Sequence, residues 1–226
     1  MTFQLNQYAD RDALAVGVAG LLAEQLRTMR PAKGVTSIAL PGGSTPAPML
    51  RALAAKDLSW LDINVTLTDE RWVPVTSDRS NHALLNRTLF TGAAGASGFV
   101  PLYTGDAEPA QGMGKINSDL ARLILPLDIA VLGMGADMHT ASLFPGATGL
   151  ANALSDTAPP AVAIAAPGAP EQRVTLTAPT LNAARRHILI TGADKRAALD
   201  HAQNLGDPML APILAVLPGA IVHYAD

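Results

Sequence analysis

Hydrophobic positions near the start of the chain repeat at helical spacing. They predict an amphipathic first helix that begins at about Asp10 and that Pro31 ends. The apolar residues of this helix are Leu14, Val18, Leu21, Leu22, Leu26 and Met29.

Beyond this helix, short apolar runs rich in β-branched residues alternate with helical patterns. The runs predict strands over residues 35–40, 64–68, 99–102, 161–166, 173–177 and 187–191, and one that starts at 127 and breaks at 133. Helices are expected over residues 46–53, 80–90, 117–125 and 194–203, and a buried helix followed by a strand over 208–225. Pro46 suits the first turn of its helix, with Thr45 or Ser44 as the cap.

This alternation predicts an α/β fold of three layers, α/β/α, with a mainly parallel central sheet. The sequence contains no internal repeat and no long linker, so residues 1–226 are expected to form a single domain. The Pro/Ala/Gly-rich segment 158–170 is the weakest part of the pattern and is expected to be a surface excursion or a small subdomain.

Composition narrows the classes of partner. With 226 residues, 49% of them apolar, the chain can bury a sizeable core. A net charge of −3 gives no general attraction to nucleic acid or to an anionic membrane, so an anionic ligand must be held by local cations and amides. The absence of cysteine excludes disulfides and thiolate chemistry.

The expected location is the cytoplasm. The amino-terminal residues have neither a basic stretch nor an apolar core, and prolines interrupt the apolar region 208–225. A monomer or a small homo-oligomer is expected.

The most informative segment is 127–146. After its strand the chain breaks at Gly133 and Gly135 and brings Asp137 and His139 to the carboxyl end, the edge where open α/β sheets bind ligands. An imidazole can accept a proton near neutral pH, and a neighbouring carboxylate can fix its tautomer. Alternatively, Asp137 caps a helix over 139–144 and the imidazole is merely exposed, which the residues alone favour slightly.

Other chemistries find less support in this segment. A Ser142 nucleophile lacks the Gly-x-Ser-x-Gly elbow. Gly133-x-Gly135 lacks the third glycine and the acidic residue of a dinucleotide site, which argues against NAD. The histidines at 82, 139, 187, 201 and 223 have no spacing typical of a metal site.

A second candidate is the turn Gly42-Gly43-Ser44-Thr45 between a strand and a helix. Its amides and hydroxyls could bind a phosphate, or Ser44 or Thr45 could simply cap the helix, and the spacing favours neither. No Gly-Lys-Ser/Thr follows, so a nucleoside triphosphate is not expected.

Charged residues complete the candidate site. Asp69 and Arg71 follow a strand at the same edge, and Arg71 could grip a phosphate or a sugar carboxylate or merely pair with an acid there. Arg173 and Lys195 are candidate phosphate clamps from later strands, although each alone would be an ordinary surface cation.

Four blocks in this order resemble the 6-phosphogluconolactonase family. One departure is Met138, where the family usually has glycine; a positive φ there would strain methionine. The blocks are Leu40-Pro-Gly-Gly-Ser-Thr-Pro46, Thr68-Asp-Glu-Arg-Trp-Val-Pro74 with Ser80-Asn81, Gly133 to Gly146, and Arg173 to Asn182 with Gly192-Ala-Asp-Lys195.

The resemblance implies the fold shared by sugar-phosphate deaminases, ribose-5-phosphate isomerases and CoA transferases. It also implies hydrolysis of 6-phospho-D-glucono-1,5-lactone in the oxidative pentose phosphate pathway, without cofactor or metal. The implied catalytic residues are His139 as general base, Asp137 and Arg71. The implied substrate-binding and phosphate-binding residues are Gly42, Gly43, Ser44, Thr45, Asp69, Arg173 and Lys195.

Two other functions remain. A glucosamine-6-phosphate deaminase shares the Gly-x-Gly-x-Asp-Gly-His pattern but continues with Ile-Ala-Phe-Asn-Glu-Pro-Gly, whereas this chain continues with Thr140-Ala-Ser-Leu-Phe-Pro-Gly146. A non-catalytic sugar-phosphate sensor would keep the phosphate-binding groups and could lose the base.

Overall fold

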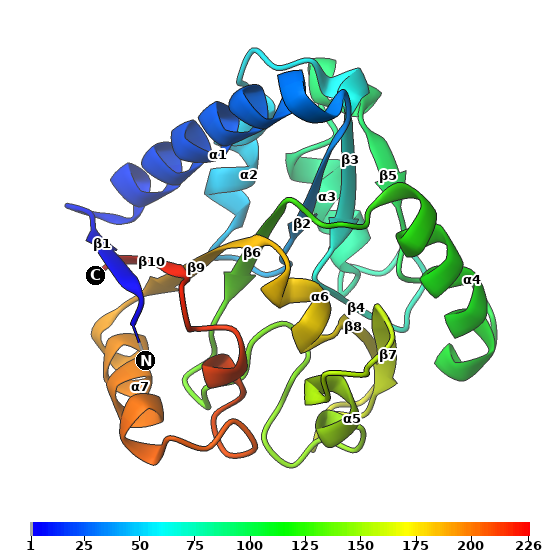
Figure 1. The fold of residues 1–226 in the computed structure, drawn as a ribbon, viewed down its shortest axis with the longest axis vertical. Coiled ribbons are helices and arrows are strands. Elements are labelled where there is room, and N and C mark those ends of the chain that lie inside the picture. The colour runs from blue at the N-terminus through cyan, green and yellow to red at the C-terminus, as the bar shows by residue number, and fades with distance from the viewer. Residues whose placement is uncertain (1) are drawn as a thin grey trace.

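A seven-stranded sheet forms the centre of the computed structural model, which describes residues 2–226 (Figure 1). Every pair of neighbouring strands in this sheet is parallel, and helices cover both faces (Figure 1). The expected three-layer α/β fold is confirmed. The strand order is β1 (Gln4–Gln7), β10 (Ile221–Ala225), β9 (Arg185–Thr191), β6 (Ile129–Gly133), β2 (Thr36–Leu40), β3 (Ile63–Leu67) and β5 (Gly98–Val100).

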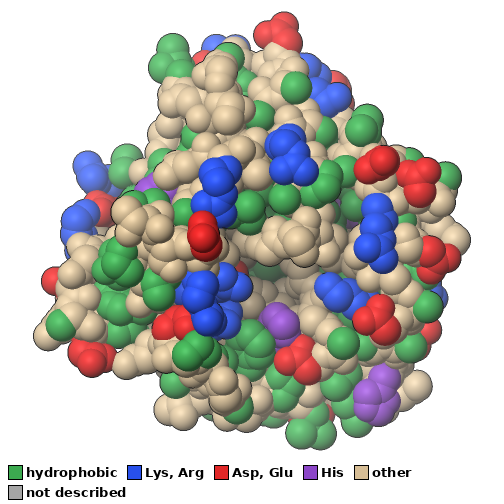
Figure 2. All heavy atoms as spheres, turned by 180° about the vertical axis from the view of Figure 1, so that it is seen from behind, with side chains coloured by type: hydrophobic (Ala, Val, Ile, Leu, Met, Phe, Trp, Pro, Cys, Tyr) green, Lys and Arg blue, Asp and Glu red, His purple; other side chains and the backbone are tan. Residues whose placement is uncertain are grey.

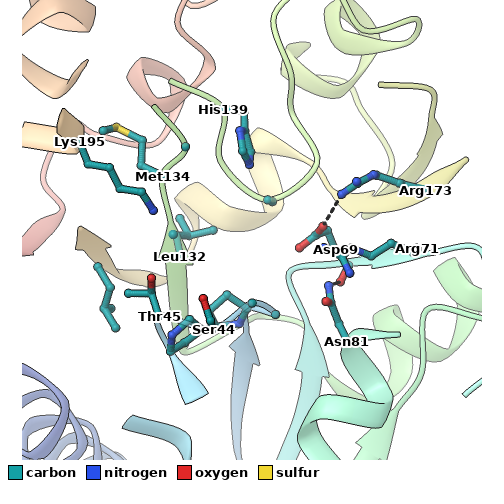
Figure 3. A pocket seen from close by; sticks show the side chains of 18 residues that line it. Ser44, Thr45, Asp69, Arg71, Asn81, Leu132, Met134, His139, Arg173 and Lys195 are labelled. Carbon is teal, nitrogen blue, oxygen red and sulfur yellow. Dashed lines mark hydrogen bonds and ion pairs between the residues drawn. The ribbon is translucent and has the colours of Figure 1, made fainter. Parts of the chain in front are cut away.

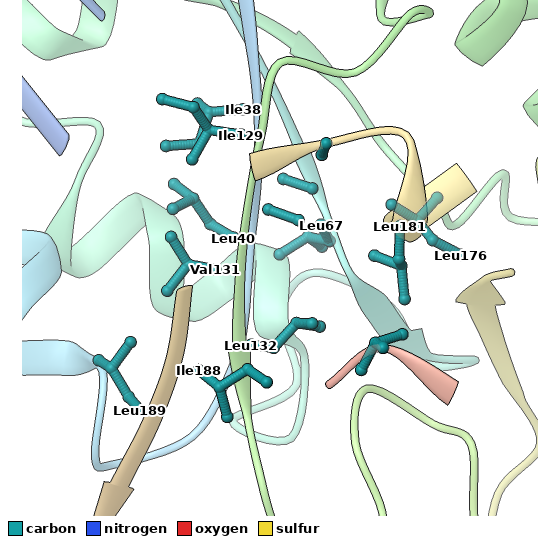
Figure 4. Packing of buried hydrophobic residues seen from close by; sticks show 14 of the residues in the cluster. Ile38, Leu40, Leu67, Ile129, Val131, Leu132, Leu176, Leu181, Ile188 and Leu189 are labelled. Atoms are coloured by element: carbon teal, nitrogen blue, oxygen red, sulfur yellow. The ribbon is translucent and has the colours of Figure 1, made fainter. Parts of the chain in front are cut away.

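The middle of this sheet is buried on both sides. Strand β2 lies between β3 and β6, and all five of its residues are buried. Aliphatic side chains of the neighbouring strands pack around it, as the near-continuous apolar runs of a parallel sheet require (Figure 4). Because these strands are parallel, the loops that follow β2, β3 and β6 meet at one edge of the sheet.

Seven α-helices surround the sheet within the described residues. They are α1 (Arg11–Lys33), α2 (Ala47–Ala54), α3 (Asn81–Thr88), α4 (Pro109–Leu123), α5 (Leu150–Leu154), α6 (Ala178–Asn182) and α7 (Ala193–Leu205). Short 3₁₀ segments lie at η1 (Trp60–Asp62), η2 (Gly92–Ala96) and η3 (Pro212–Ala215). None of the helices described is both long and apolar enough to cross a membrane.

Several helix boundaries differ from the sequence prediction. Helix α1 continues past residue 31 and ends at Gly34, whose φ of 75° closes the last turn. Helix α4 begins at Pro109, eight residues earlier than expected, because Glu108 and Gln111 form a capping box there. The helix expected before the last strand is only the short η3 segment.

A second, three-stranded antiparallel sheet was not predicted. It consists of β4 (Asp69–Arg71), β8 (Arg173–Leu176) and β7 (Ala161–Ile164), in that order. Strand β4 follows β3 almost directly, and the amide of Leu176 donates to the carbonyl of Thr68 at 2.8 Å. The segment 158–170 therefore contains an edge strand of this small sheet.

A buried chain of hydrogen bonds links β9 and β10 to α1. The Tyr8 hydroxyl lies 2.9 Å from Nδ1 of His223. Nε2 of His223 lies 3.0 Å from Nδ1 of His187. Nε2 of His187 in turn lies 3.0 Å from the side-chain amide oxygen of Gln25. The amide oxygen can only accept, so His187 donates through Nε2; if both rings are neutral, His223 then donates through Nε2 to His187 Nδ1 and accepts from Tyr8. Burial lowers the pKa of His187 to about 4 and that of His223 to about 3.

This buried network of hydrogen bonds predicts that the stability of the protein falls in acid. A histidine with a depressed pKa in the folded state binds its proton more readily when unfolded, so its contribution to stability is complete above about pH 6.5 and is lost below it. The free energy of unfolding should fall between pH 7 and 5 by up to about 1.4 kcal/mol per pH unit for each histidine. Urea unfolding across this range measures the slope.

The control is His223→Gln, which keeps a donor and an acceptor but removes one titrating group. It should reduce the slope by about half, since one of two histidines remains. An unfolding free energy that is flat from pH 7 to 5 in the parent would contradict the assignment of neutral, buried rings.

Candidate active site

A cavity of about 240 Å³ opens at the edge where the loops after β2, β3 and β6 meet. Figure 2 shows a hollow in this face, with basic side chains on both sides and a histidine at its margin. Nine of the ten residues proposed from the sequence line the cavity: Gly42, Gly43, Ser44, Thr45, Asp69, Arg71, His139, Arg173 and Lys195. The tenth, Asp137, contacts His139 from outside the lining.

The turn after β2 presents polar groups to the cavity. A side chain at Gly42 would overlap the amide of Asn81, and Gly43 has a φ of 97°. Among the residues described, the amides and hydroxyls of Ser44 and Thr45 form no hydrogen bond. The expected cap is wrong: α2 starts after Pro46 without a side-chain cap. Both hydroxyls therefore stay available to a ligand.

The loop after β6 holds an acid–imidazole pair. Nδ1 of His139 lies 2.5 Å from Oδ1 of Asp137, and this bond lowers the pKa of the Asp137 carboxyl. A side chain at Gly135 would overlap both groups, so only glycine allows the pair to form. Because Nδ1 is engaged, Nε2 is the nitrogen left for a ligand or water.

The alternative of a helix over 139–144 is wrong. Thr140 and Leu143 instead form an isolated antiparallel bridge around a tight turn. Met138 and Ala141 have φ values of 65° and 48°, so the methionine does occupy a left-handed position. Its backbone carbonyl accepts a hydrogen bond from the Ile213 amide at 3.1 Å, which helps to hold the strained loop.

Ser142 has a structural role. Its hydroxyl donates to Asp69 Oδ2 at 2.6 Å, and both residues are buried. The same carboxylate oxygen lies 4.0 Å from Nη1 of Arg173. Asp69 is therefore held between the Ser142 hydroxyl and the Arg173 guanidinium, and Figure 3 shows its contact with Arg173.

The two arginines of the small sheet face each other across β4 and β8, where Arg71 pairs with Arg173. Burial lowers the pKa of Arg173, opposed by the charge of Asp69. Nε of each arginine is buried and has no hydrogen-bond partner in the described structure, while Arg71 donates through Nη1 to the carbonyl of Arg79. Both guanidinium groups bring positive charge to the cavity lining, which favours an anionic ligand.

Glu70 lies in the block Thr68-Asp-Glu-Arg-Trp-Val-Pro74, but its structural role was not predicted from the sequence. Its buried carboxylate accepts hydrogen bonds from the amides of Arg71, Asn81 and His82 and from the Ser80 hydroxyl, at 2.8–3.0 Å. Burial raises its pKa, although these bonds oppose the shift. Glu70 thus connects β4 to the start of α3. The only sequence signal for this connection was the pair Ser80-Asn81, which accompanies the Thr68–Pro74 block.

Asn81 is a cavity residue that the sequence prediction omitted. Its side-chain amide donates to the Asp69 carbonyl at 2.8 Å and lies against Gly42. It therefore fixes the turn after β2 relative to β4. The lining also includes apolar groups from the strand ends, which no sequence motif marked: Leu132, Met134, Ala141 and Leu189.

Lys195 lies in the first turn of α7 and reaches the cavity from the side opposite Arg173 in Figure 3, with His139 between them. The described residues provide no hydrogen-bond or ion-pair partner for its ammonium group. They also contain no cluster of three histidine or acidic side chains placed to hold a metal ion. The site thus gathers an imidazole, three cationic side chains and the free amides of Ser44 and Thr45.

Comparison with known proteins identifies the family of the chain. The family model described as glucosamine-6-phosphate isomerases/6-phosphogluconolactonase matches residues 9–224. A 6-phosphogluconolactonase of Rhizobium meliloti is 41% identical over 96% of this chain and 94% of its own, and one of Pseudomonas putida is 39% identical over 98% and 92%.

A solved 6-phosphogluconolactonase structure from Shewanella baltica superimposes with a TM-score of 0.95 at 31% identity, covering 99% of this chain and 98% of that one. The match spans both sheets and all the loops around the cavity. The chain belongs to the glucosamine-6-phosphate isomerase/6-phosphogluconolactonase family.

Proposed function

We propose that the protein hydrolyses 6-phospho-D-glucono-1,5-lactone to 6-phospho-D-gluconate. The observation that carries this proposal is the Asp137–His139 pair beside a cavity lined by the cations of Arg71, Arg173 and Lys195. The amides of Ser44 and Thr45 in the same lining form no hydrogen bond in the described structure. An imidazole held by a carboxylate suits the activation of water, and the cations and free amides suit a phosphorylated, oxygen-rich substrate. Relatives named 6-phosphogluconolactonase at about 40% identity support it.

In this mechanism His139 Nε2 takes a proton from a water molecule as its oxygen attacks the lactone carbonyl carbon. Asp137 holds the ring through Nδ1 and stabilises the imidazolium that forms. Backbone amides near Gly43, with Arg71, would stabilise the oxyanion, because the Gly135 amide already donates to the carbonyl of His139 at 3.0 Å. When the ring C–O bond breaks, the imidazolium returns the proton to the leaving oxygen, which becomes a hydroxyl group.

The phosphate would be held by the Gly42–Thr45 turn together with Arg173 and Lys195, and Arg71 would contact the phosphate or the sugar. Cations and free amides are required because the chain is net negative and gives a dianion no general attraction. We also propose that the enzyme acts in the cytoplasm, as a monomer or a small homo-oligomer, without nucleic-acid or membrane partners.

One feature separates the lactonase from the deaminase. Phe144 precedes Pro145-Gly146, where the deaminase pattern has glutamate, and its ring lies against His139. A carboxylate that could join in proton transfer is thus replaced by an apolar face. The intact Asp137–His139 pair likewise argues against a silent sensor.

A coupled assay on freshly generated phosphogluconolactone tests the function, with the spontaneous opening of the δ-lactone subtracted. Release of 6-phosphogluconate above that background, without ammonia release from glucosamine 6-phosphate, is the expected result. Ammonia release without lactone hydrolysis would identify a deaminase, and binding without either reaction would identify a sensor.

His139→Gln in the same assay tests the general base. Glutamine keeps hydrogen bonding but cannot accept the proton, so kcat should fall by roughly 10²–10⁴-fold. KM should change far less, because the phosphate is bound by other residues. A folded variant that retains most of the parent kcat would remove this role from His139.

Lys195→Ala tests the phosphate clamp. Loss of one charge-assisted contact should raise KM for the phosphorylated lactone by roughly 10–100-fold, with a smaller change in kcat. Lys115→Ala is the matched control, since Lys115 pairs with Asp119 on the surface of α4 and should leave KM unaltered. If Lys195→Ala keeps the parent KM and the parent discrimination against unphosphorylated gluconolactone, Lys195 is only a surface cation.

A further inference from the structure

The ring of Phe144 contacts one side chain from the loop after β6 and one from the small sheet. The ring of Phe144 stacks on the imidazole of His139, with centroids 4.1 Å apart and planes inclined by 22°. The guanidinium carbon of Arg173 lies 5.1 Å from the centroid of the same ring. Phe144 is not among the described residues that line the cavity, whereas both of its partners are.

We infer that Phe144 is a positioning residue that sets His139 and Arg173 for the reaction together. This inference rests on the proposed lactonase function. Phe144 does not touch the cavity, so its influence on a substrate must pass through the two side chains that it contacts.

Neither partner is fixed by its hydrogen bonds alone. The hydrogen bond between His139 Nδ1 and the Asp137 carboxylate holds one ring nitrogen but does not by itself fix the tilt of the imidazole plane. The face-to-face contact with Phe144 restricts this tilt and so fixes the direction of Nε2. Arg173 has only a 4.0 Å ion pair to Asp69, and its Nε has no partner in the described structure. The aromatic face supplies a second support for its guanidinium.

The loop is built to place this ring. The amide of Leu143 donates to the carbonyl of Thr140 at 2.9 Å, and Ala141 adopts a φ of 48° between them. The hydroxyl of Thr140 donates to the Gly133 carbonyl at 2.8 Å, which anchors the turn to the end of β6. The chain thereby reverses within four residues and brings Phe144 back beside His139.

The ring also suits the charge change of the reaction. When His139 accepts a proton its ring becomes cationic, and the negative face of an aromatic ring attracts a cation. A leucine of similar apolar character would fill space without this attraction and without holding the ring plane. The aromatic face should therefore affect kcat through His139 and KM through Arg173.

The experiment compares Phe144→Leu with Phe144→Tyr, each in the parent and in the His139→Gln background. Phe144→Leu should lower kcat by about three- to tenfold and raise KM several-fold, and Phe144→Tyr should keep both within about twofold. In the His139→Gln background, Phe144→Leu should lower kcat no further but should still raise KM, because only the contact with Arg173 remains.

Phe90→Leu is the matched control. Phe90 packs edge-on against Phe99 with centroids 5.2 Å apart, outside the cavity lining, so its loss should change stability without changing kcat or KM. Equal losses of kcat for Phe144→Leu in both backgrounds would overturn the inference and leave Phe144 a packing residue. So would a Phe144→Tyr variant as impaired as the leucine variant.

Failure of the proposed function is distinguishable from failure of this inference. A parent protein without lactonase activity would refute the function, and binding of inorganic phosphate measured by calorimetry would then test Phe144. Weaker phosphate binding by Phe144→Leu, with normal binding by Phe144→Tyr, would support the contact with Arg173. Equal binding by all three proteins would overturn it.

Discussion

The parallel pairing of β2 with β3 and β6 is the constraint on which the site depends. Because all three strands run the same way, each delivers its following loop to one edge of the sheet. The glycine-rich turn Gly42–Thr45, an acidic strand and an acid–imidazole pair therefore meet around one cavity, although they lie up to about a hundred residues apart in the sequence. A reversal of any of these strands would separate them.

The small antiparallel sheet supplies the two arginines of the cavity lining. It faces Arg71 and Arg173 toward each other, and buried Glu70 secures its first strand to the start of α3 through three hydrogen bonds. Loss of the Glu70 acceptor would leave several donors unsatisfied at once. The pairing of β4 with β8 therefore sets the positions of the two arginines relative to each other.

Much of this arrangement could be predicted from the sequence. The apolar runs marked β2 and β6, and their glycines marked the loops that carry Ser44 and His139. Strand β4 escaped prediction because three residues that include two carboxylates show no apolar alternation. Phe144 fell within the alternative helix over 139–144, and only the tertiary turn at Ala141 brings its ring against that of His139. The bonds of Glu70 to residues 80–82 likewise depend on tertiary contacts that no local pattern encodes.

We propose that one cavity binds the phosphate and places the reacting carbon beside His139. A crystal structure of the complex with 6-phosphogluconate would show whether it does. We expect the phosphate to contact the Gly42–Thr45 turn and Lys195, and the carboxyl carbon to lie within reach of a water bound to His139 Nε2. A product molecule bound outside this cavity, or with its carboxyl group directed away from His139, would rule out this arrangement.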